Sequence, residues 1–525
     1  MDHDRLVVVD SGVSTAAENI VVDRAWLAGH GHDGRDSLLR FYRSRPSVWL
    51  GAHQFPEREV RLDYCERQGL SVVRRLTGGG TVYVDEQQFG WSLIVPRDPD
   101  AGSDEFAQLH RRAAQAVSSA LAGLGVDAVF KEPNDLEVAG RKLASCFATL
   151  RGGSALVHGT VLMDVDVDRA LHALRVPTEK LSADGLAGAR QRLTTLAELC
   201  PVVPTLKQIK RALAAAFVDA FALSPRKATK SVYAALRAPH RDTGSGGSPV
   251  AEAVLSTSSA DRPGEALFKT AAGLLRARID VDSSAGSVRR LTLAGDVFVH
   301  PADLFERVGQ DAVGVALSAL PAWVAERLGG DDVRLQGCTE RDVAEVVMLA
   351  ADRTDQRRLF GFTPEQANAL MVLGRQQGLS VRQILERAQV MLVPYCAKPV
   401  DCRWRSRDGC PECGMCEVGR AYQLGRIHGM RVLSINNYEH LCETLAELRE
   451  AGVQGLVGMC CQNFFIKRNR AFVDSQIPMV LMDISGSNCY ELGQEEQAYA
   501  GTFAARSRLD VPVLERVMHY VPVRR

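Results

Sequence analysis

The sequence predicts an α/β protein with several domains, and three observations support this fold class. The chain has 525 residues, which is too many for one hydrophobic core and suits roughly three domains. Short apolar runs typical of strands alternate with longer runs of helical periodicity. The segment HRDTGSGGSPVAEAV, which begins at His240, is rich in glycine and serine and is expected to be a linker between domains.

Residues 1–240, before the linker, are expected to form the first and largest domain, with mixed strands and helices. An apolar strand, Leu6 to Asp10, precedes a helix around AENIVVDRAWL. Further strands are expected at SVWLGAHQ, LSVVRRL, GGTVYV and GWSLIV, and the helix FAQLHRRAAQAVSSALAGLG follows them.

Three more segments are expected after the linker. Residues 251–355 contain the strand-rich stretch ALFKTAAGLLRARIDVDSSAGSVRRLTLAGDVFVHP and two helices, near DLFERVG and VGVALSALPAWVAERLG. Residues 356–392 have helical periodicity broken at Gly378, which predicts a helical connector or, less favoured, a DNA-binding helix–turn–helix. Residues 393–525 carry a cysteine cluster followed by alternating strands and helices, which predicts a small parallel α/β unit.

The overall composition argues against several classes of partner. Lys+Arg and Asp+Glu total 63 each, so no excess charge points to nucleic acid or to an anionic membrane. The start, MDHDRLVVVDSG, lacks the basic region of a signal peptide. The longest apolar stretch, LAAAFVDAFAL, is interrupted by Asp219 and is too short to span a bilayer. We therefore expect a cytoplasmic protein with no nucleic-acid or membrane partner.

The stretch RRLTGGGTVYV, which starts at Arg74, indicates an anion site. Its glycines let a ligand approach the backbone, where N–H groups and the guanidinium groups of Arg74 and Arg75 hold negative charge. No Gly-Lys-Ser/Thr follows, so the stretch is not a P-loop, and contiguous glycines leading into a strand do not match a dinucleotide-binding motif. The alternative is a hairpin turn with both arginines in solvent.

Two further clusters favour the anion site. The first, EPNDLEVAGRKLAS, contains an Asn134–Asp135 pair and, after a strand and a glycine turn, the cations Arg141 and Lys142. The second, LVHGTVLMDVD, is an apolar strand with three polar or small residues expected at its head: His158, Gly159 and Thr160.

Together these motifs make residues 1–225 resemble the lipoate–protein ligase family, which is related to biotin ligases. The stretches AENIVVDRAW, LRFYRSRPSVWLGAHQ and ARQRLTTLAEL add to the resemblance, in the order and spacing of the family. The part after the linker resembles the family's small accessory domain, through LFKTAAGLLRARIDV and LTLAGDVFVHPADLFE. The resemblance implies a class II synthetase-like α/β fold.

The resemblance also implies a reaction in two steps. ATP activates the carboxylate of lipoic acid to lipoyl-AMP, and the lipoyl group then passes to a lysine of a lipoyl carrier domain. Such carriers are 2-oxoacid dehydrogenase acyltransferase subunits or the glycine cleavage H-protein. Because attack of a carboxylate on a phosphate brings like charges together, cations must screen them.

The family's site residues map onto this sequence. Lys142 matches the catalytic lysine, Asn134 and Asp135 would bind the nucleotide or Mg²⁺, and His158 and Thr160 would close the acyl pocket. The nucleotide is expected to contact Arg75, Gly78, Gly79, Gly80, Thr81, Val82 and Tyr83 in addition to these residues. The alternatives are a solvated turn lysine at 142, a turn aspartate at 135 and a structural histidine at 158.

Two departures from the family leave the acyl chain open, lipoate or octanoate. Val84 stands where the family commonly has histidine, and the segment Ser145-Cys146-Phe147-Ala148 replaces its usual Gly-Ser-Ala sequence. The related octanoyltransferases form a thioester on a cysteine just before the Asn-Asp position, but here that place reads VFKEPND. Cys146 is expected to be a buried small hydrophobe. ATP-dependent ligation is therefore favoured over an octanoyl or lipoyl transferase, a non-catalytic lipoate sensor, and biotin ligation.

The cysteines of the last quarter predict a metal site. Nine of the 13 cysteines lie there, and C-x-x-C-x-x-C spacing suits a [4Fe–4S] cluster or, as second choice, zinc. The expected ligands are Cys396, Cys402, Cys410, Cys413 and Cys416, with Cys460, Cys461 and Cys489 as further candidates. The region resembles an uncharacterised cysteine-rich domain marked by CxxCGxC. Its metal is expected either to sense or support the sulfur state of the lipoyl product or to be a structural staple.

Overall fold

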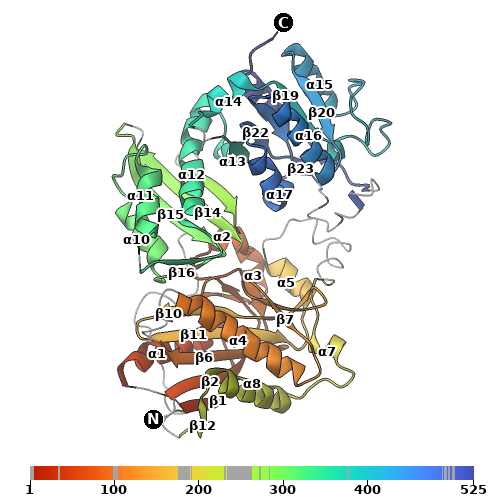
Figure 1. Cartoon of the computed structure of the whole chain (residues 1–525). Coiled ribbons are helices and arrows are strands. Elements are labelled where there is room, and N and C mark those ends of the chain that lie inside the picture. The colour runs from red at the N-terminus through yellow and green to blue at the C-terminus, as the bar shows by residue number, and fades with distance from the viewer. Residues whose placement is uncertain are drawn as a thin grey trace.

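The structure is a computed structural model (Figure 1). It describes residues 5–33, 36–97, 104–174, 190, 192–229, 232, 263–270, 273–282, 284–330, 332–374, 378–486, 489, 494, 497–498 and 503–524. The predicted linker at 240–254 and part of the ARQRLTTLAEL motif lie outside these residues. Figure 1 shows a large-sheet region (residues 5–232) at the bottom, a middle region (263–360) above it, and a C-terminal region (362–524) at the top right.

The large-sheet region is built on a sheet of nine strands. Along the main path their order is β12 (Ser224–Lys227), β1 (Arg5–Ser14), β2 (Asp36–Ser44), β6 (Gln88–Pro96), β11 (Ser154–Leu162), β9 (Arg141–Ser145), β8 (Asp135–Val138) and β7 (Val129–Lys131). Strand β10 (Phe147–Arg151) also pairs with β11. A second sheet has the order β4 (Ser71–Arg74), β3 (Ser47–Leu50), β5 (Val82–Val84).

Helices cover both faces of the nine-stranded sheet because its strands alternate their side chains between two cores. In β2, Leu39 and Phe41 enter the core beneath α4 (Glu105–Ala122) and α8 (Leu206–Phe221), which lie side by side in Figure 1. Leu38 and Tyr42 point to the opposite core, against α1 (Ala16–Asp33). Four shorter helices connect strands: α2 (Pro56–Glu59), α3 (Leu62–Arg67), α5 (Val167–Ala173) and α7 (Leu196–Leu199).

The middle region consists of antiparallel strands covered by helices. Its sheet has the order β13 (Gly264–Lys269), β14 (Leu274–Asp282), β15 (Ser287–Gly295), and β16 (Phe298–His300) pairs with β17 (Arg334–Gln336). The helices are α10 (Leu304–Asp311), α11 (Leu320–Leu328) and α12 (Glu340–Phe360).

Ion pairs join the middle region to α2 of the large-sheet region. Arg58 pairs with Glu265 at 2.6 Å, Arg278 pairs with Glu57, and Arg276 approaches Glu59 at 3.6 Å. The two regions therefore meet along a charged seam that is partly shielded from solvent.

The C-terminal region is an α/β unit, as predicted, and four of its five strands form the expected parallel arrangement. Its sheet has the order β18 (Leu370–Leu373), β22 (Met479–Met482), β21 (Leu456–Met459), β19 (Val390–Pro394), β20 (Arg431–Ile435). Strands β19 to β22 are parallel, and β18 is antiparallel to β22. The flanking helices are α13 (Pro364–Asn368), α14 (Val381–Arg387), α15 (Glu417–Ile427), α16 (Tyr438–Glu450), α17 (Gln462–Asp474) and α20 (Val511–Met518).

Two local expectations are wrong. The connector predicted as helical at 356–392 contains strand β18 and most of strand β19, because apolar runs of four or five residues are too short for periodicity to separate strand from helix. His158 lies in the middle of β11 and not at its head. In the part of the chain that the structure describes, no helix combines the length and apolarity needed to cross a bilayer.

Candidate active site and cysteine clusters

The glycine loop joins β4 to β5, and its three glycines have different surroundings. A Cβ on Gly78 would lie 2.2 Å from the carbonyl oxygen of Val297 in the middle region. Gly79 has a φ of +88°, and a Cβ there would lie 2.9 Å from the ring of Phe147. Only Gly80 has no atom within 4 Å of a built Cβ. Close packing therefore requires the first two glycines, and the third faces open space.

The side chain of Arg75 fixes the conformation of this loop through hydrogen bonds. Its side chain is buried at 2% exposure and donates to Thr77 Oγ1 at 3.1 Å, Trp49 O at 3.0 Å and Gly78 O at 2.6 Å. Its guanidinium also lies 4.1 Å from the ring centroid of Phe147. Burial lowers the pKa of Arg75 to about 9, which still leaves a cation at neutral pH.

Arg74, the residue before Arg75 in the chain, also binds backbone carbonyls. One Nη1 donates to the carbonyls of Gly51, Ala52 and Gln54 at 3.0, 3.1 and 2.8 Å. The alternative of a hairpin with both arginines in solvent is therefore wrong, since both side chains bind backbone carbonyls.

His158 lies beneath the loop as a buried, neutral side chain. Its Nε2 lies 2.8 Å from Thr77 Oγ1, and its ring is 6.3 Å from that of Trp49 and 5.7 Å from that of Phe147. Burial, with the nearby charge of Arg75, lowers the pKa of His158 to about 3. This histidine supports the loop through Thr77.

Lys142 and Asp135 form the exposed polar part of the candidate site. Lys142 Nζ lies 2.6 Å from Asp135 Oδ1, and the two side chains are 26% and 33% exposed. Asn134 Nδ2 donates to the same carboxylate oxygen at 2.9 Å. Neighbouring strands β9 and β8 carry the pair, so the sequence motif EPNDLEVAGRKLAS is one hairpin with its cation and carboxylate in contact.

Thr160 binds the end of β9. Its Oγ1 lies 3.1 Å from Ser145 Oγ, which also accepts from the Thr160 N–H at 3.2 Å. A Cβ on Gly159 would lie 1.9 Å from Ser145 O, so only glycine allows β11 to pass this close. Val82 and Tyr83 lie in β5, opposite Trp49 and Val48 of β3.

Phe147 brings the three motif clusters together. Its ring contacts Arg75 and the Gly79 position of the glycine loop and lies beside His158 of β11. Phe147 also begins strand β10, which follows the strand that carries Lys142. Arg75 and His158 therefore meet at Phe147, and the hairpin of Lys142 is connected to this contact by the short chain segment from Lys142 to Phe147.

The sequence analysis missed Gln54, which ties the loop to the middle region. Its Oε1 accepts from the Gly51 N–H at 2.8 Å and from Thr81 Oγ1 at 2.7 Å, and its Nε2 donates to Asp296 Oδ1 at 2.7 Å. No local pattern signals a bond between residues this far apart in sequence.

Cys146 is enclosed in the core. Burial raises the pKa of its thiol well above the usual range, and its backbone is bound by Asn134 O and His110 Nε2 at 2.9 and 2.8 Å. A thiol held neutral in this way lacks the thiolate character of a nucleophile.

The structure divides the predicted cysteine ligands into two groups. The first, which we call the loop group, consists of Cys402, Cys410, Cys413 and Cys416. Cys402, Cys410 and Cys416 lie within electrostatic range of the buried Lys398, and Cys413 lies within range of Cys410. Cys396, predicted to join them, lies instead in a pocket with Cys460, Cys461 and Cys489.

Lys398 organises the loop group. Its side chain is 1% exposed, and Nζ donates to the carbonyls of Trp404, Arg407 and Gly409 at 2.8, 2.8 and 3.0 Å. Burial lowers the pKa of Lys398, while charge on the nearby Cys410, Cys402 and Cys416 opposes that shift. Cys410 Sγ accepts from the Glu412 N–H at 3.4 Å. Within the described residues, no three His, Cys, Asp or Glu side chains converge as they would around a single metal ion.

The family model "Lipoyl protein ligase A/B catalytic domain" matches residues 15–218. Lipoate-protein ligase A subunit 1 of Thermoplasma acidophilum is 30% identical over 206 residues, which are 37% of this chain and 76% of that protein. A solved bipartite lipoate protein ligase from the same organism aligns with 45% of this chain and 91% of that one at 28% identity, with a TM-score of 0.39.

Two further relatives differ in their named activities. Lipoate-protein ligase LplJ of Bacillus subtilis is 32% identical over 166 residues, 32% of this chain and 49% of that protein, so the match spans about half of it. Octanoyltransferase LipM of Moorella thermoacetica is 30% identical over 192 residues, 33% of this chain and 70% of that protein. The chain therefore belongs to the lipoate ligase and octanoyltransferase family of enzymes, with its mixed α/β, class II synthetase-like fold.

Proposed function

We propose that this protein is an ATP-dependent lipoate–protein ligase. It forms lipoyl-AMP from lipoic acid and ATP and transfers the lipoyl group to a lysine of a lipoyl carrier domain. The observation that supports the proposal is the contact of the glycine loop and His158 with Phe147, which follows the hairpin of Lys142 and Asp135 in the chain.

The proposed roles follow from the exposure of each group. Gly80, with open space beside it, presents backbone to the nucleotide phosphates, and Arg75 keeps the loop in shape. Lys142 exchanges its partly exposed partner Asp135 for the substrate carboxylate and the attacked phosphate. The pair is partly exposed, and breaking an ion pair that contacts solvent costs about 0–1 kcal/mol, so the exchange requires little free energy.

Asn134 and Asp135 alone provide too few ligands for Mg²⁺, so they would share the ion with the nucleotide phosphates. They offer one amide oxygen and one carboxylate, whereas Mg²⁺ at nucleotide sites takes one or two carboxylates together with phosphate oxygens and water. When bound, the ion would neutralise the phosphates. Asp135 would hold it while Lys142 turns to the substrate.

The enclosure of Cys146 favours ligation over acyl transfer through a thioester. Such transfer needs a nucleophilic thiolate, and burial keeps the thiol of Cys146 neutral. The octanoyltransferase relative keeps transfer as the second candidate. Octanoyl carrier protein used as donor without ATP would modify the acceptor if that second candidate were correct.

The test is lipoylation of a carrier domain followed by intact-mass measurement. Purified protein is incubated with ATP, Mg²⁺, lipoate and an acyltransferase lipoyl domain or glycine cleavage H-protein, beside Lys142→Ala. Lys131→Ala serves as control, because Lys131 is an exposed lysine paired with Glu137 one strand away. A lipoyl-sized gain that needs ATP, persists in the control and is lost in Lys142→Ala supports the ligase. No gain with bound lipoate would support the sensor.

We also propose that the loop group of Cys402, Cys410, Cys413 and Cys416 holds a [4Fe–4S] cluster, with zinc as second choice. The N–H donated to Cys410 Sγ and the buried ammonium of Lys398 support this, because both favour thiolate charge. Such thiols suit a reducing compartment, so we propose a cytoplasmic location. We propose domains at 1–240 and 251–355, with the third beginning before β18, because β18 belongs to the C-terminal sheet.

A further inference from the structure

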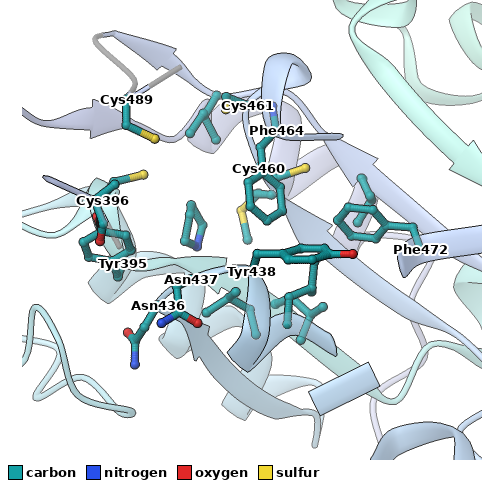
Figure 2. Close-up of a pocket in the computed structure, with 18 residues that line it drawn as sticks. Tyr395, Cys396, Asn436, Asn437, Tyr438, Cys460, Cys461, Phe464, Phe472 and Cys489 are labelled. Carbon is teal, nitrogen blue, oxygen red and sulfur yellow. Dashed lines mark hydrogen bonds between the residues drawn. The ribbon is translucent and has the colours of Figure 1, made fainter. Parts of the chain in front are cut away.

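A cavity of about 90 Å³ lies at one end of the C-terminal sheet. Apolar side chains make up most of its wall, among them Leu392, Ile435, Phe464 and Phe472. Four cysteines also line it: Cys396, Cys460, Cys461 and Cys489. Figure 2 shows the thiols of Cys396 and Cys489 directed into the same space, with the other two cysteines across from them.

The topology of the sheet explains this position. The strand order β20-β19-β21-β22 means that the chain leaves β19 toward one side and later returns to β21 on the other. In open parallel sheets, such a switch leaves a crevice outside the carboxyl ends of the strands, where ligands bind. Cys396 follows the end of β19, Cys460 directly follows β21, and Asn436 directly follows β20.

The four thiols lie close to one another. Cys461 is within electrostatic range of Cys460, Cys396 and Cys489, and Cys460 is within range of Cys396. Cys396 and Cys489 pack against the same small apolar cluster around Tyr395. Thiols from separate segments of the chain are therefore gathered at one cavity.

The cavity wall includes the polar side chain of Asn436. Among the described residues, its buried Oδ1 has no hydrogen-bond partner, and its Nδ2 contacts Ser406 O at 3.5 Å.

We propose that Cys396, Cys460, Cys461 and Cys489 ligate a second iron–sulfur cluster, separate from the loop group. On binding, each thiol releases its proton to solvent and its sulfur bonds to iron. Four thiolates are the usual ligands of such clusters.

The dimensions favour a cluster over a single ion. A lone zinc ion draws its sulfurs to about 2.3 Å from one point. A cluster core is several atoms across, so its sulfurs stand further apart. One water needs about 10–15 Å³. The cavity, at about 90 Å³, is several times larger.

The experiment counts metal centres in the full-length protein. Protein purified without oxygen is reconstituted with Fe²⁺ and sulfide, and iron per chain is measured together with the Mössbauer spectrum. Wild type is compared with the pocket variant Cys460→Ser/Cys461→Ser and the loop variant Cys410→Ser/Cys413→Ser. Cys442→Ser is the control, because Cys442 lies on α16 outside the cavity lining.

We expect the pocket variant to lose roughly half of the iron and the loop variant to lose the other half, since one cluster is removed in each. Cys442→Ser should keep all of it. A circular dichroism spectrum and a second pocket variant, Cys489→Ala, guard against loss of iron through misfolding. Lipoylation is read separately, so failure of the ligase proposal leaves this result intact.

Three results would overturn the second cluster. The first is an iron content in the pocket variants equal to that of wild type. The second is zinc in place of iron on the four pocket thiols under the same conditions, and the third is a disulfide between pocket cysteines, found by mass spectrometry of the oxygen-free protein. Each of these outcomes assigns the cavity to another chemistry.

Discussion

The large-sheet region and the C-terminal region assemble their candidate functional residues in different ways. In the large-sheet region, the polar groups of short motifs bind one another, as Arg75 binds Gly78 O and Lys142 binds Asp135. In the C-terminal pocket, cysteines from separate segments meet in apolar surroundings, beside the unpaired oxygen of Asn436. The first site is a finished hydrogen-bonded framework. The second, by the proposal above, would be completed by an iron–sulfur cluster.

The largest effect should come from removing the centre of that framework. Arg75→Met leaves Trp49 O, Gly78 O and Thr77 Oγ1 without their buried donor. We expect the free energy of unfolding to fall by about 3–5 kcal/mol, because three buried acceptors lose their donor and each unsatisfied group costs about 1–3 kcal/mol. Urea unfolding measures it. The control Arg67→Met removes only an exposed ion pair with Asp63. An equal loss of stability in the two variants would contradict the role of Arg75 in the hydrogen-bonded framework.

The glycine loop offers a comparison within one motif. Gly78→Ala drives a Cβ to 2.2 Å from Val297 O, whereas Gly80→Ala meets nothing within 4 Å. We expect Gly78→Ala to cost about 1–3 kcal/mol of stability through overpacking, and Gly80→Ala to leave stability nearly unchanged while slowing lipoylation. Equal stability of the two variants in urea would contradict the packing role of Gly78.

The charged seam between the regions predicts a pH dependence. Burial, reinforced by Asp296 and opposed by Arg276, raises the pKa of Glu59 to about 7. Between the ordinary pKa of 4.5 and this value, the folded protein binds the proton more tightly than the unfolded chain. The contribution to stability is therefore present at low pH and is lost as pH rises through about 7.

Glu59→Gln should remove this pH dependence. We expect the variant to be more stable than wild type by about 1–3 kcal/mol at pH 8 and equal to it near pH 4.5, by the linkage of pKa to stability. Thermal unfolding at several pH values measures the difference, and the exposed Glu66→Gln is the control. A constant difference between Glu59→Gln and wild type across the range would refute the shifted carboxyl group.

The smallest effect is expected for Cys146, whose thiol lies in the core of the large-sheet region and not in the C-terminal pocket. Cys146→Ala should leave lipoylation within about two-fold of wild type and cost about 1 kcal/mol or less through the small cavity created. It should also leave the iron content unchanged. Loss of acyl transfer in this variant would instead identify Cys146 as a nucleophile and favour the transferase.

Much of the fold could be predicted from the sequence, because its signals are local. The alternation in GWSLIV and the helical period of FAQLHRRAAQAVSSALAGLG became β6 and α4. Strands β18 and β19 were hidden, since their short apolar runs fit a helix as well as a buried strand.

The candidate sites divide in the same way. Spacing alone grouped Cys410, Cys413 and Cys416, and the hairpin motif placed Lys142 beside Asp135. The pocket of Cys396 depends on strand order, and the bond from Gln54 to Asp296 depends on how two regions pack. Neither leaves a local pattern in the sequence.

The three carbonyls that bind Lys398 have a consequence for how the loop group would acquire metal. An ammonium has three N–H donors, and those of Lys398 go to Trp404, Arg407 and Gly409. The segment therefore loses its conformational entropy when the chain folds, and a metal that binds later would not have to order it. In contrast to a zinc finger, which gains its shape from the ion, the backbone of this loop would keep its conformation with and without metal, and the Lys398 ammonium would serve as an internal counter-charge.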